Sequence, residues 1–146
     1  MIPEILEDAL GFNIYRVSLL FRREFIWALK QYERTPEQWH ILLALWSAER
    51  PLKQCELVQL TLKDKPTISR SIFRLERDGW VEKVSDAKDA RVTVICLTEK
   101  SRSLKQEVFQ KLEAHRDTLL KDFTKQELST LMQLLKKLRH VLGDYS

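Results

Sequence analysis

The stretch that most constrains the fold is residues 65–97, KPTISRSIFRLERDGWVEKVSDAKDARVTVICL. Its first half carries Ile68, Ile72 and Leu75 at helical spacing, which predicts a helix with one buried stripe. Gly79 follows this helix, and glycine is the residue that most easily adopts the left-handed conformation that ends a helix. The sequence therefore predicts a short helix that stops at a defined point.

The second half of the stretch predicts a β-hairpin. Residues 80–84 and 92–97 are rich in β-branched side chains, and a charged loop at 85–91 separates them. The whole chain has only three Gly and four Pro, so loops should be few and helices should dominate. The expected fold is mainly α with a small β-hairpin that projects as a wing.

Two further helices are predicted before residue 65. Thr35, Pro36 and Gln38 suit the N-cap, the first helical position and the capping box of a helix that runs to about residue 49. A second helix follows over 54–62, and residues 63–65 form a tight turn. Two short helices, a turn and a third helix make a helix-turn-helix arrangement.

Long apolar helices are expected at both ends of the chain. Residues 4–33 predict one helix that is apolar nearly all round, which must be covered from more than one side. After a helix over 98–121, Thr124 and Glu127 form a capping box for the last helix. That helix carries a heptad seam at Leu128, Leu131, Leu135, Leu138 and Leu142. A second copy of the chain is the favoured cover; the alternative is packing within one chain.

The exposed face of the helix that begins near Pro66 carries groups suited to a DNA groove. Arginine can fork onto guanine, and hydroxyls reach bases or phosphates. Opposite the buried stripe, or on its flank, the sequence places Thr67, Ser69, Arg70, Ser71, Arg74 and Arg77. The alternative is that these side chains only solvate the helix.

The loop of the hairpin carries Lys88, Asp89 and Arg91. A basic hairpin beside a recognition helix can reach the adjacent minor groove, whose negative potential attracts arginine. Asp89 is expected to orient Arg91, or another arginine, through paired hydrogen bonds. The alternative is an ordinary solvated turn.

These motifs together resemble the MarR family of bacterial winged helix-turn-helix regulators. The resemblance rests on the runs LERDGWVE at 75–82, DAR at 89–91, LTEK at 97–100 and TPEQW at 35–39. It extends to the order of helices along nearly the whole chain. Ser101 departs from the glycine usual in the family, which should affect only the start of a helix.

The resemblance implies a single unit over 1–146, with a DNA-binding lobe at 36–97 and dimerisation regions at 1–34 and 98–146. It implies a homodimer that reads a pseudo-palindromic operator in double-stranded DNA and acts as a ligand-responsive repressor. It also assigns groove contacts to Thr67, Ser69, Arg70 and Arg74 and minor-groove insertion to Arg91.

The resemblance further implies a small effector, often aromatic or anionic, bound between the dimerisation helices and the lobe. Residues that could line such a crevice are Phe12, Arg16, Trp39, His40 and Leu43. The alternative is that these side chains belong to the core.

Other functional classes find little support in the sequence. Cys55 and Cys96 lack metal-ligand spacing and are expected to be small buried residues. The three histidines are scattered, so no metal or cofactor is expected. No catalytic motif is present, so the chain is not expected to be an enzyme. No signal peptide or membrane span is predicted, which favours the cytoplasm.

The net charge of +4 permits a polyanionic partner without requiring one. A winged-helix module that binds another protein and no DNA is therefore the alternative function.

Overall fold

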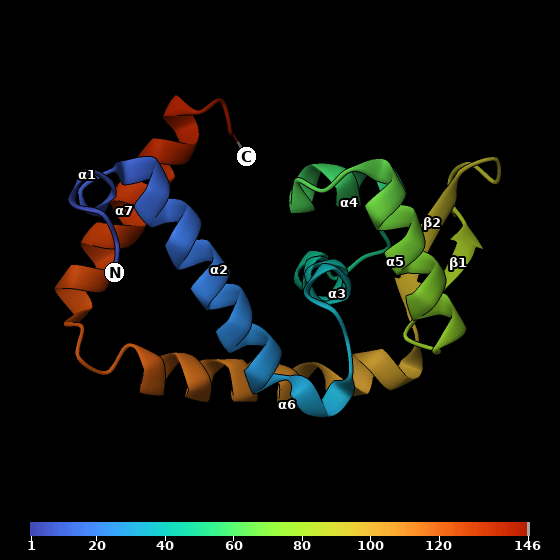
Figure 1. Ribbon diagram of the computed structural model, residues 1–146. Coiled ribbons are helices and arrows are strands. Elements are labelled where there is room, and N and C mark those ends of the chain that lie inside the picture. The colour runs from blue at the N-terminus through green and yellow to red at the C-terminus, as the bar shows by residue number, and fades with distance from the viewer. Residues whose placement is uncertain (146) are drawn as a thin grey trace. The chain divides into compact units, whose positions relative to one another are not determined.

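Helix α5, Lys65–Arg77, begins where the local sequence dictates (Figure 1). In the computed structural model, which describes residues 1–145, the carboxylate of Asp64 accepts a hydrogen bond of 2.7 Å from the backbone N–H of Thr67. This N-cap satisfies one of the N–H groups that the first turn of a helix leaves without a partner. The helix thus starts one residue before the predicted Pro66.

The end of α5 is set by Gly79. The backbone N–H of Trp80 donates to the carbonyl of Leu75 at 2.8 Å, and that of Gly79 donates to Glu76 at 3.1 Å. Gly79 has a φ of 76°, which completes a Schellman motif. The predicted stop is confirmed, and it turns the chain directly into the hairpin.

The hairpin consists of β1, Val81–Ser85, and β2, Thr93–Leu97, which pair antiparallel with Lys83 opposite Ile95. Leu52 forms an isolated β-bridge to this hairpin, because its N–H and carbonyl exchange hydrogen bonds of 3.1 and 2.7 Å with Ile95. The loop that contains Leu52 is thereby fixed to the hairpin.

Two helices support α5 from behind. Helix α3, Pro36–Ala48, opens with the predicted capping box, in which Gln38 N–H donates to Thr35 Oγ1 at 3.2 Å. Helix α4, Gln54–Thr61, follows. Figure 1 shows α3, α4 and α5 gathered beside the hairpin, which is the expected helix-turn-helix with a wing.

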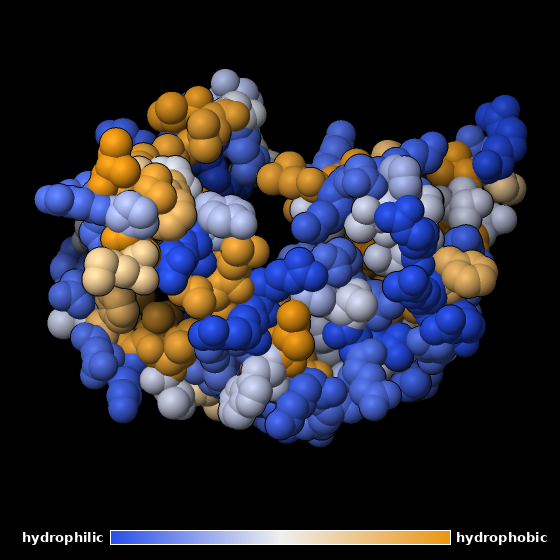
Figure 2. All heavy atoms as spheres, in the orientation of Figure 1, coloured by the Kyte–Doolittle hydropathy of each residue, from blue (hydrophilic) through white to orange (hydrophobic). Residues whose placement is uncertain are grey.

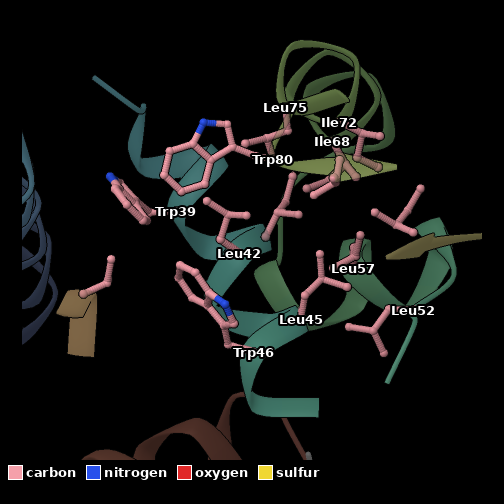
Figure 3. Close-up of a cluster of buried hydrophobic side chains, with 14 of the residues drawn as sticks. Trp39, Leu42, Leu45, Trp46, Leu52, Leu57, Ile68, Ile72, Leu75 and Trp80 are labelled. Atoms are coloured by element: carbon pink, nitrogen blue, oxygen red, sulfur yellow. The ribbon is translucent and has the colours of Figure 1, made fainter. Parts of the chain in front are cut away.

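The core of this lobe is formed by side chains of α3, α4, α5 and the hairpin (Figure 3). The predicted inner stripe of α5 is confirmed, since Ile68, Ile72 and Leu75 are buried. Each such side chain contributes about 1.5–3 kcal/mol when it leaves water. Other large buried side chains include Trp39, Ile41, Leu42, Leu45, Trp46, Leu52, Leu57 and Trp80. This core fixes which face of α5 is turned outward.

Ser101 has a larger role than the start of α6, Glu99–Leu119. It is fully buried, and its hydroxyl donates to the carbonyl of Trp80. Its own carbonyl accepts a hydrogen bond of 3.1 Å from the indole N–H of Trp46. Ser101 therefore ties α6 to the tryptophans of the core.

The N-terminal segment is broken, so the prediction of one helix over 4–33 is wrong. Ala9 is extended, with ψ of 113°, and the side chain of Asn13 donates to the carbonyls of Glu7 and Ala9 at 2.7 and 3.0 Å. These bonds compensate for the break between two helices. The segment consists of α1 (Glu4–Glu7), α2 (Leu10–Ala28) and the 3₁₀ helix η1 (Lys30–Tyr32).

Helix α2 has no buried residue among those described, although it is strongly apolar. Hydrophobic side chains are visible along it in Figure 2. Its exposed large side chains are Leu10, Ile14, Tyr15, Val17, Leu19, Leu20, Phe21, Ile26 and Trp27. This apolar surface is of the kind that another molecule covers.

The chain divides into two compact units, Met1–Leu112 and a second that begins at Glu113. The second unit contains α7, Lys125–Val141, which opens with the predicted capping box of Thr124 and Glu127. Helix α7 also exposes apolar side chains, among them Leu131, Leu134, Leu135, Val141 and Leu142. No helix within residues 1–145 has the length and apolar character needed to cross a membrane.

Candidate nucleic-acid interface

The outward face of α5 carries arginines, as predicted. Arg70 and Arg74 are exposed, and Thr67 is half-buried beside them. The guanidinium of Arg70 donates to Thr67 Oγ1 at 3.4 Å, which directs it along the N-terminal half of the helix. Arg74 has no ion pair within the described part of the chain. Both cations are therefore available to an external anion.

Ser69 is exposed on the flank of the same helix, and its hydroxyl has a hydrogen-bond partner in α4. The side-chain amide of Gln54 donates to Ser69 Oγ at 2.7 Å. Gln54 is the first residue of α4, so this bond fixes the start of α4 against α5. No local pattern indicates it, because the two residues meet only in the folded lobe.

Ser71 does not belong to the outward face, and its predicted role in DNA contact is wrong. Only 7% of Ser71 is exposed. It lies three residues after Ile68 and four before Leu75, which is the spacing of one helical stripe. Ser71 therefore points toward the lobe with the apolar residues.

Arg77, at the C-terminal end of α5, is held by Asp78. Its Nε donates to Asp78 Oδ1 at 2.9 Å, and Arg34 donates to Oδ2 at 2.5 Å. These hydrogen bonds hold the pKa of Asp78 well below its usual range, and the bond from Arg77 has the larger effect. Asp78 thus offsets part of the charge of Arg77, which is less available to an external anion than Arg70 or Arg74.

The loop between β1 and β2 presents Arg91 in a fixed orientation. Arg91 Nε donates to Asp89 Oδ1 at 3.1 Å, and a terminal nitrogen donates to Oδ2 at 3.3 Å. The side chain of Arg91 is nevertheless 91% exposed. Hydrogen bonding by Arg91 also lowers the pKa of Asp89. The predicted paired hydrogen bond is confirmed.

The tip of this hairpin is hydrophilic on the face seen in Figure 2, where it projects at the upper right. Lys88 is exposed there, and its backbone N–H donates to Asp86 Oδ1 at 3.3 Å. The tip thus offers two cations beyond the end of the sheet.

The hairpin and α5 are joined by side-chain bonding as well as by the chain. The backbone N–H of Lys83 in β1 donates to Glu76 Oε2 in α5 at 3.2 Å. Together with the short connection through Gly79, this bond fixes the wing to the helix. The cations of α5 and of the wing therefore lie on two directly connected elements.

Trp39, expected to line an effector crevice, lies in the core, and that prediction is wrong. It is fully buried, and its ring meets those of Phe25 and Tyr32 edge-on at 6.4 and 5.5 Å. Burial raises the pKa of Tyr32 to about 12, and a hydrogen bond to Glu107 acts in the same direction. The alternative reading of Trp39 as a core residue is the correct one.

The other predicted crevice residues are spread along two helices. His40 is exposed as a whole residue, but protein packed around its imidazole lowers its pKa, as does the charge of Lys63. Leu43 packs against the core. Phe12 is half-buried and Arg16 is exposed in α2. The ring of Phe25 in α2 lies against Trp39 and His40 of α3. At 1.5 Å per residue, Phe12 and Arg16 lie about 20 and 14 Å along α2 from Phe25.

A cavity of about 390 Å³ lies elsewhere, behind the hairpin. It is bounded by the end of α3, the following loop, the end of β2 and the start of α6. Its walls include apolar side chains, while Arg50, Arg102 and Lys105 bring positive charge and Glu49 one negative charge. The remaining lining residues are Leu45, Trp46, Pro51, Cys96 and Leu97.

The cysteines differ from expectation. Cys55 is exposed, so its predicted burial is wrong, and Cys96 is half-buried. Burial raises the pKa of Cys96, which disfavours the reactive thiolate. Within residues 1–145 there is no group of three or more His, Cys, Asp or Glu side chains that could hold a metal ion.

Comparison with known proteins agrees with this arrangement. Residues 23–108, more than half of the chain, match the family described as transcriptional regulator SarA/Rot. The chain is 34% identical over 103 residues to the HTH-type transcriptional regulator TtmR of Methylorubrum extorquens (strain PA1). That match covers 70% of this chain and 52% of TtmR, so the chain spans about half the length of this curated relative.

Solved structures, MarR of E. coli among them, share the fold. A mutant MarR from E. coli complexed with operator DNA is 26% identical, with a TM-score of 0.80 over 90% of this chain and 94% of that one. CouR from Rhodococcus jostii RHA1, bound to p-coumaroyl-CoA, has a TM-score of 0.84 at 19% identity and covers 99% of both chains. The resemblance to MarR regulators is therefore confirmed, and so is the winged helix-turn-helix fold.

Proposed function

We propose that this chain, which belongs to the SarA/Rot family of transcriptional regulators, binds double-stranded DNA through α5 and the β1–β2 wing. One observation carries the proposal. The free arginines of α5 and the oriented Arg91 lie on elements that the Lys83–Glu76 hydrogen bond joins. A module that bound only protein would not need cations both on a helix and on the hairpin joined to it.

In this proposal α5 enters the major groove. Arg70 reads a guanine through O6 and N7, and Arg74 contacts phosphate or a neighbouring base. Thr67 and Ser69 place hydroxyls at the N-terminal end of the helix, where the helix dipole also favours phosphate. Arg77 contacts only the phosphate backbone in this proposal, because its guanidinium is already hydrogen-bonded to Asp78.

The wing reaches the adjacent minor groove. Asp89 holds two nitrogens of Arg91, which leaves the other terminal nitrogen for the bases or the backbone. Because the side chain is oriented before binding, less conformational freedom is lost when DNA binds. Lys88 supplies a second positive charge at the tip.

A homodimer is the second part of the proposal. The exposed apolar residues of α2 and α7 supply the surface for it. Two copies related by a two-fold axis would read a pseudo-palindromic operator with half-sites about one helical turn apart. The solved complex of a mutant MarR with operator DNA supports the binding of DNA by this fold. Repression, a cytoplasmic location and the division into a lobe at 36–97 and dimerisation regions at 1–34 and 98–146 belong to the same proposal.

The test of DNA binding uses the wing. Arg91→Ala should weaken binding to the DNA upstream of the chain's own gene by roughly tenfold or more per contact, given about 1.5–3 kcal/mol for a charged hydrogen bond. The loss should be similar across sequences. Fluorescence anisotropy with a labelled duplex measures it.

The matched control is Arg23→Ala, since the side chain of Arg23 is also exposed but lies on α2. It should bind DNA like the parent. Equal affinities for the parent and the Arg91→Ala protein would remove the wing from the interface. Absence of DNA binding by the parent at every salt concentration, with binding to a protein instead, would favour the alternative module.

Response to a small effector is the third part of the proposal. The cavity behind the hairpin joins apolar walls to three cations, which suits a small aromatic anion. Arg50 and Lys105 are paired with Glu56 and Glu49 at 2.7 and 3.2 Å, whereas Arg102 lies 3.9 Å from Glu99, so Arg102 is the cation that would hold the anion. CouR, which has the same fold, is a structure with p-coumaroyl-CoA bound. The crevice residues that lie outside the core, half-buried Phe12 and exposed Arg16 and His40, remain a second proposed site.

The effector proposal is tested with salicylate as the probe and thermal unfolding as the readout. Binding should raise Tm in a concentration-dependent way. Arg102→Ala should abolish the shift if the ligand occupies the cavity, whereas Arg16→Ala should abolish it if the ligand occupies the crevice. A series of aromatic carboxylates that never shifts Tm would contradict the proposed ligand class.

A further inference from the structure

Phe73 stands out on the outward face of α5. It is 61% exposed, whereas Ile68, Ile72 and Leu75 of the same helix are buried. The residue that follows it is Arg74, and Arg70 lies three positions before it. An apolar ring thus stands among the side chains that face DNA in the proposed complex.

The position of Phe73 follows from helical geometry. It comes four residues after Ser69, so the two side chains lie on the same side of the helix, one turn apart. Ser69 is itself exposed and bonded to Gln54 at the start of α4. Phe73 therefore lies one turn after Ser69 on α5, three residues before Glu76, and it is not part of the core stripe.

The surroundings of Phe73 point to nucleic acid rather than to a protein. Its neighbours one turn away on α5 are all polar or charged: Ser69, Arg70, Glu76 and Arg77. A protein-binding surface is usually a contiguous apolar patch. A single ring between arginines instead suits a polyanion that offers one small apolar group at a time.

We infer that Phe73 is a specificity-determining residue that reads the C5-methyl group of a thymine in the major groove. This inference rests on the proposed function. The thymine methyl is the apolar group among the base edges of that groove, and a phenyl ring can contact it without leaving a polar group unpaired. Phe73 would then recognise an apolar group on a base, whereas Arg70 recognises hydrogen-bond acceptors on a guanine.

The geometry also fixes where that thymine lies. Residues 70 and 73 are three apart, which is about 4.5 Å along a helix, while successive base pairs are about 3.4 Å apart. The thymine read by Phe73 is therefore expected within one or two base pairs of the guanine read by Arg70, once in each half-site.

The experiment removes the methyl group from the DNA and the ring from the protein. Duplexes that the parent binds are first selected from a random library. Each thymine in a selected site is then replaced by deoxyuridine, which differs only in lacking the methyl. The parent should lose about fourfold in affinity at one position per half-site, the equivalent of about 0.8 kcal/mol for one buried methylene.

Phe73→Ala should bind the thymine and deoxyuridine duplexes equally at that position. Phe73→Leu, which keeps an apolar side chain, should retain part of the discrimination. Circular dichroism checks that both variants fold, as expected for a change at an exposed site. Library selection with Phe73→Ala should also relax the preference for thymine there.

The outcomes separate this inference from the proposed function. If the parent selects no DNA, the proposed function fails. If the parent selects a site but Phe73→Ala keeps the same sensitivity to deoxyuridine, Phe73 does not read the methyl and the function stands. If Phe73→Ala loses binding to a protein partner and none to DNA, the inference is likewise overturned.

Discussion

Arg70→Ala is expected to lose its preference for one base pair in each half-site and to bind the cognate duplex more weakly. A good bidentate contact between arginine and guanine contributes about 1–3 kcal/mol of discrimination, which corresponds to roughly 5- to 150-fold. Arg70 is exposed, lies opposite the buried stripe and is directed by Thr67. Competition between the cognate duplex and single-base variants measures the effect.

Arg77→Ala is the matched control, because it removes the same side chain from the same helix. Arg77 is already bonded to Asp78, so its loss should change affinity little and uniformly across the variant duplexes. Should both variants keep the sequence preference of the parent, Arg70 would not contact a base.

Trp39→Ala is expected to lower the free energy of unfolding by about 3–5 kcal/mol, the usual cost of truncating a buried tryptophan. Trp39 is fully buried, and its ring meets the rings of Tyr32 and Trp80 edge-on at 5.5 and 5.9 Å. Truncation removes these contacts together and leaves a cavity among the remaining aromatic rings. A loss of this size is a large part of the stability of a typical domain.

Urea unfolding at a fixed protein concentration measures this effect, since association of chains would add to the apparent stability. Phe73→Ala is the control, because it removes an aromatic ring that is largely exposed and should change stability little. A loss below about 1 kcal/mol for Trp39→Ala would contradict the account of the core.

The start and end of α5 could be predicted because they depend on neighbours in sequence. Thr67 and Asp64 meet within one turn, and Gly79 ends the helix through bonds to residues only a few positions away. The pair of Asp89 and Arg91 was predictable for the same reason. Local spacing is sufficient where both partners lie in the same turn or loop.

The errors have two physical sources. Ser71 is polar, which favours an exposed position, but its spacing to Ile68 and Leu75 places it on the buried side of α5. The aromatic ring of Trp39 could line a crevice, but a small lobe also fills its core with aromatic rings. For both residues, position in the helix decides burial more than residue type does.

Other features depend on tertiary contacts that the sequence does not display. Gln54 and Ser69 meet only once α4 packs on α5, and Ser101 meets Trp80 only once α6 begins beneath the hairpin. The break at Ala9 lies in a segment whose apolar periodicity continues on both sides. Periodicity therefore predicted helix there but not its interruption.

The salt dependence of DNA binding tests the central claim most directly. For the parent, the logarithm of the association constant for the upstream duplex should fall linearly with the logarithm of salt concentration, by about 0.9 for each phosphate neutralised. Arg91→Ala should give a slope shallower by about one for each wing that contacts DNA. Binding that does not change with salt, or that is absent at the lowest salt concentration, would contradict the account.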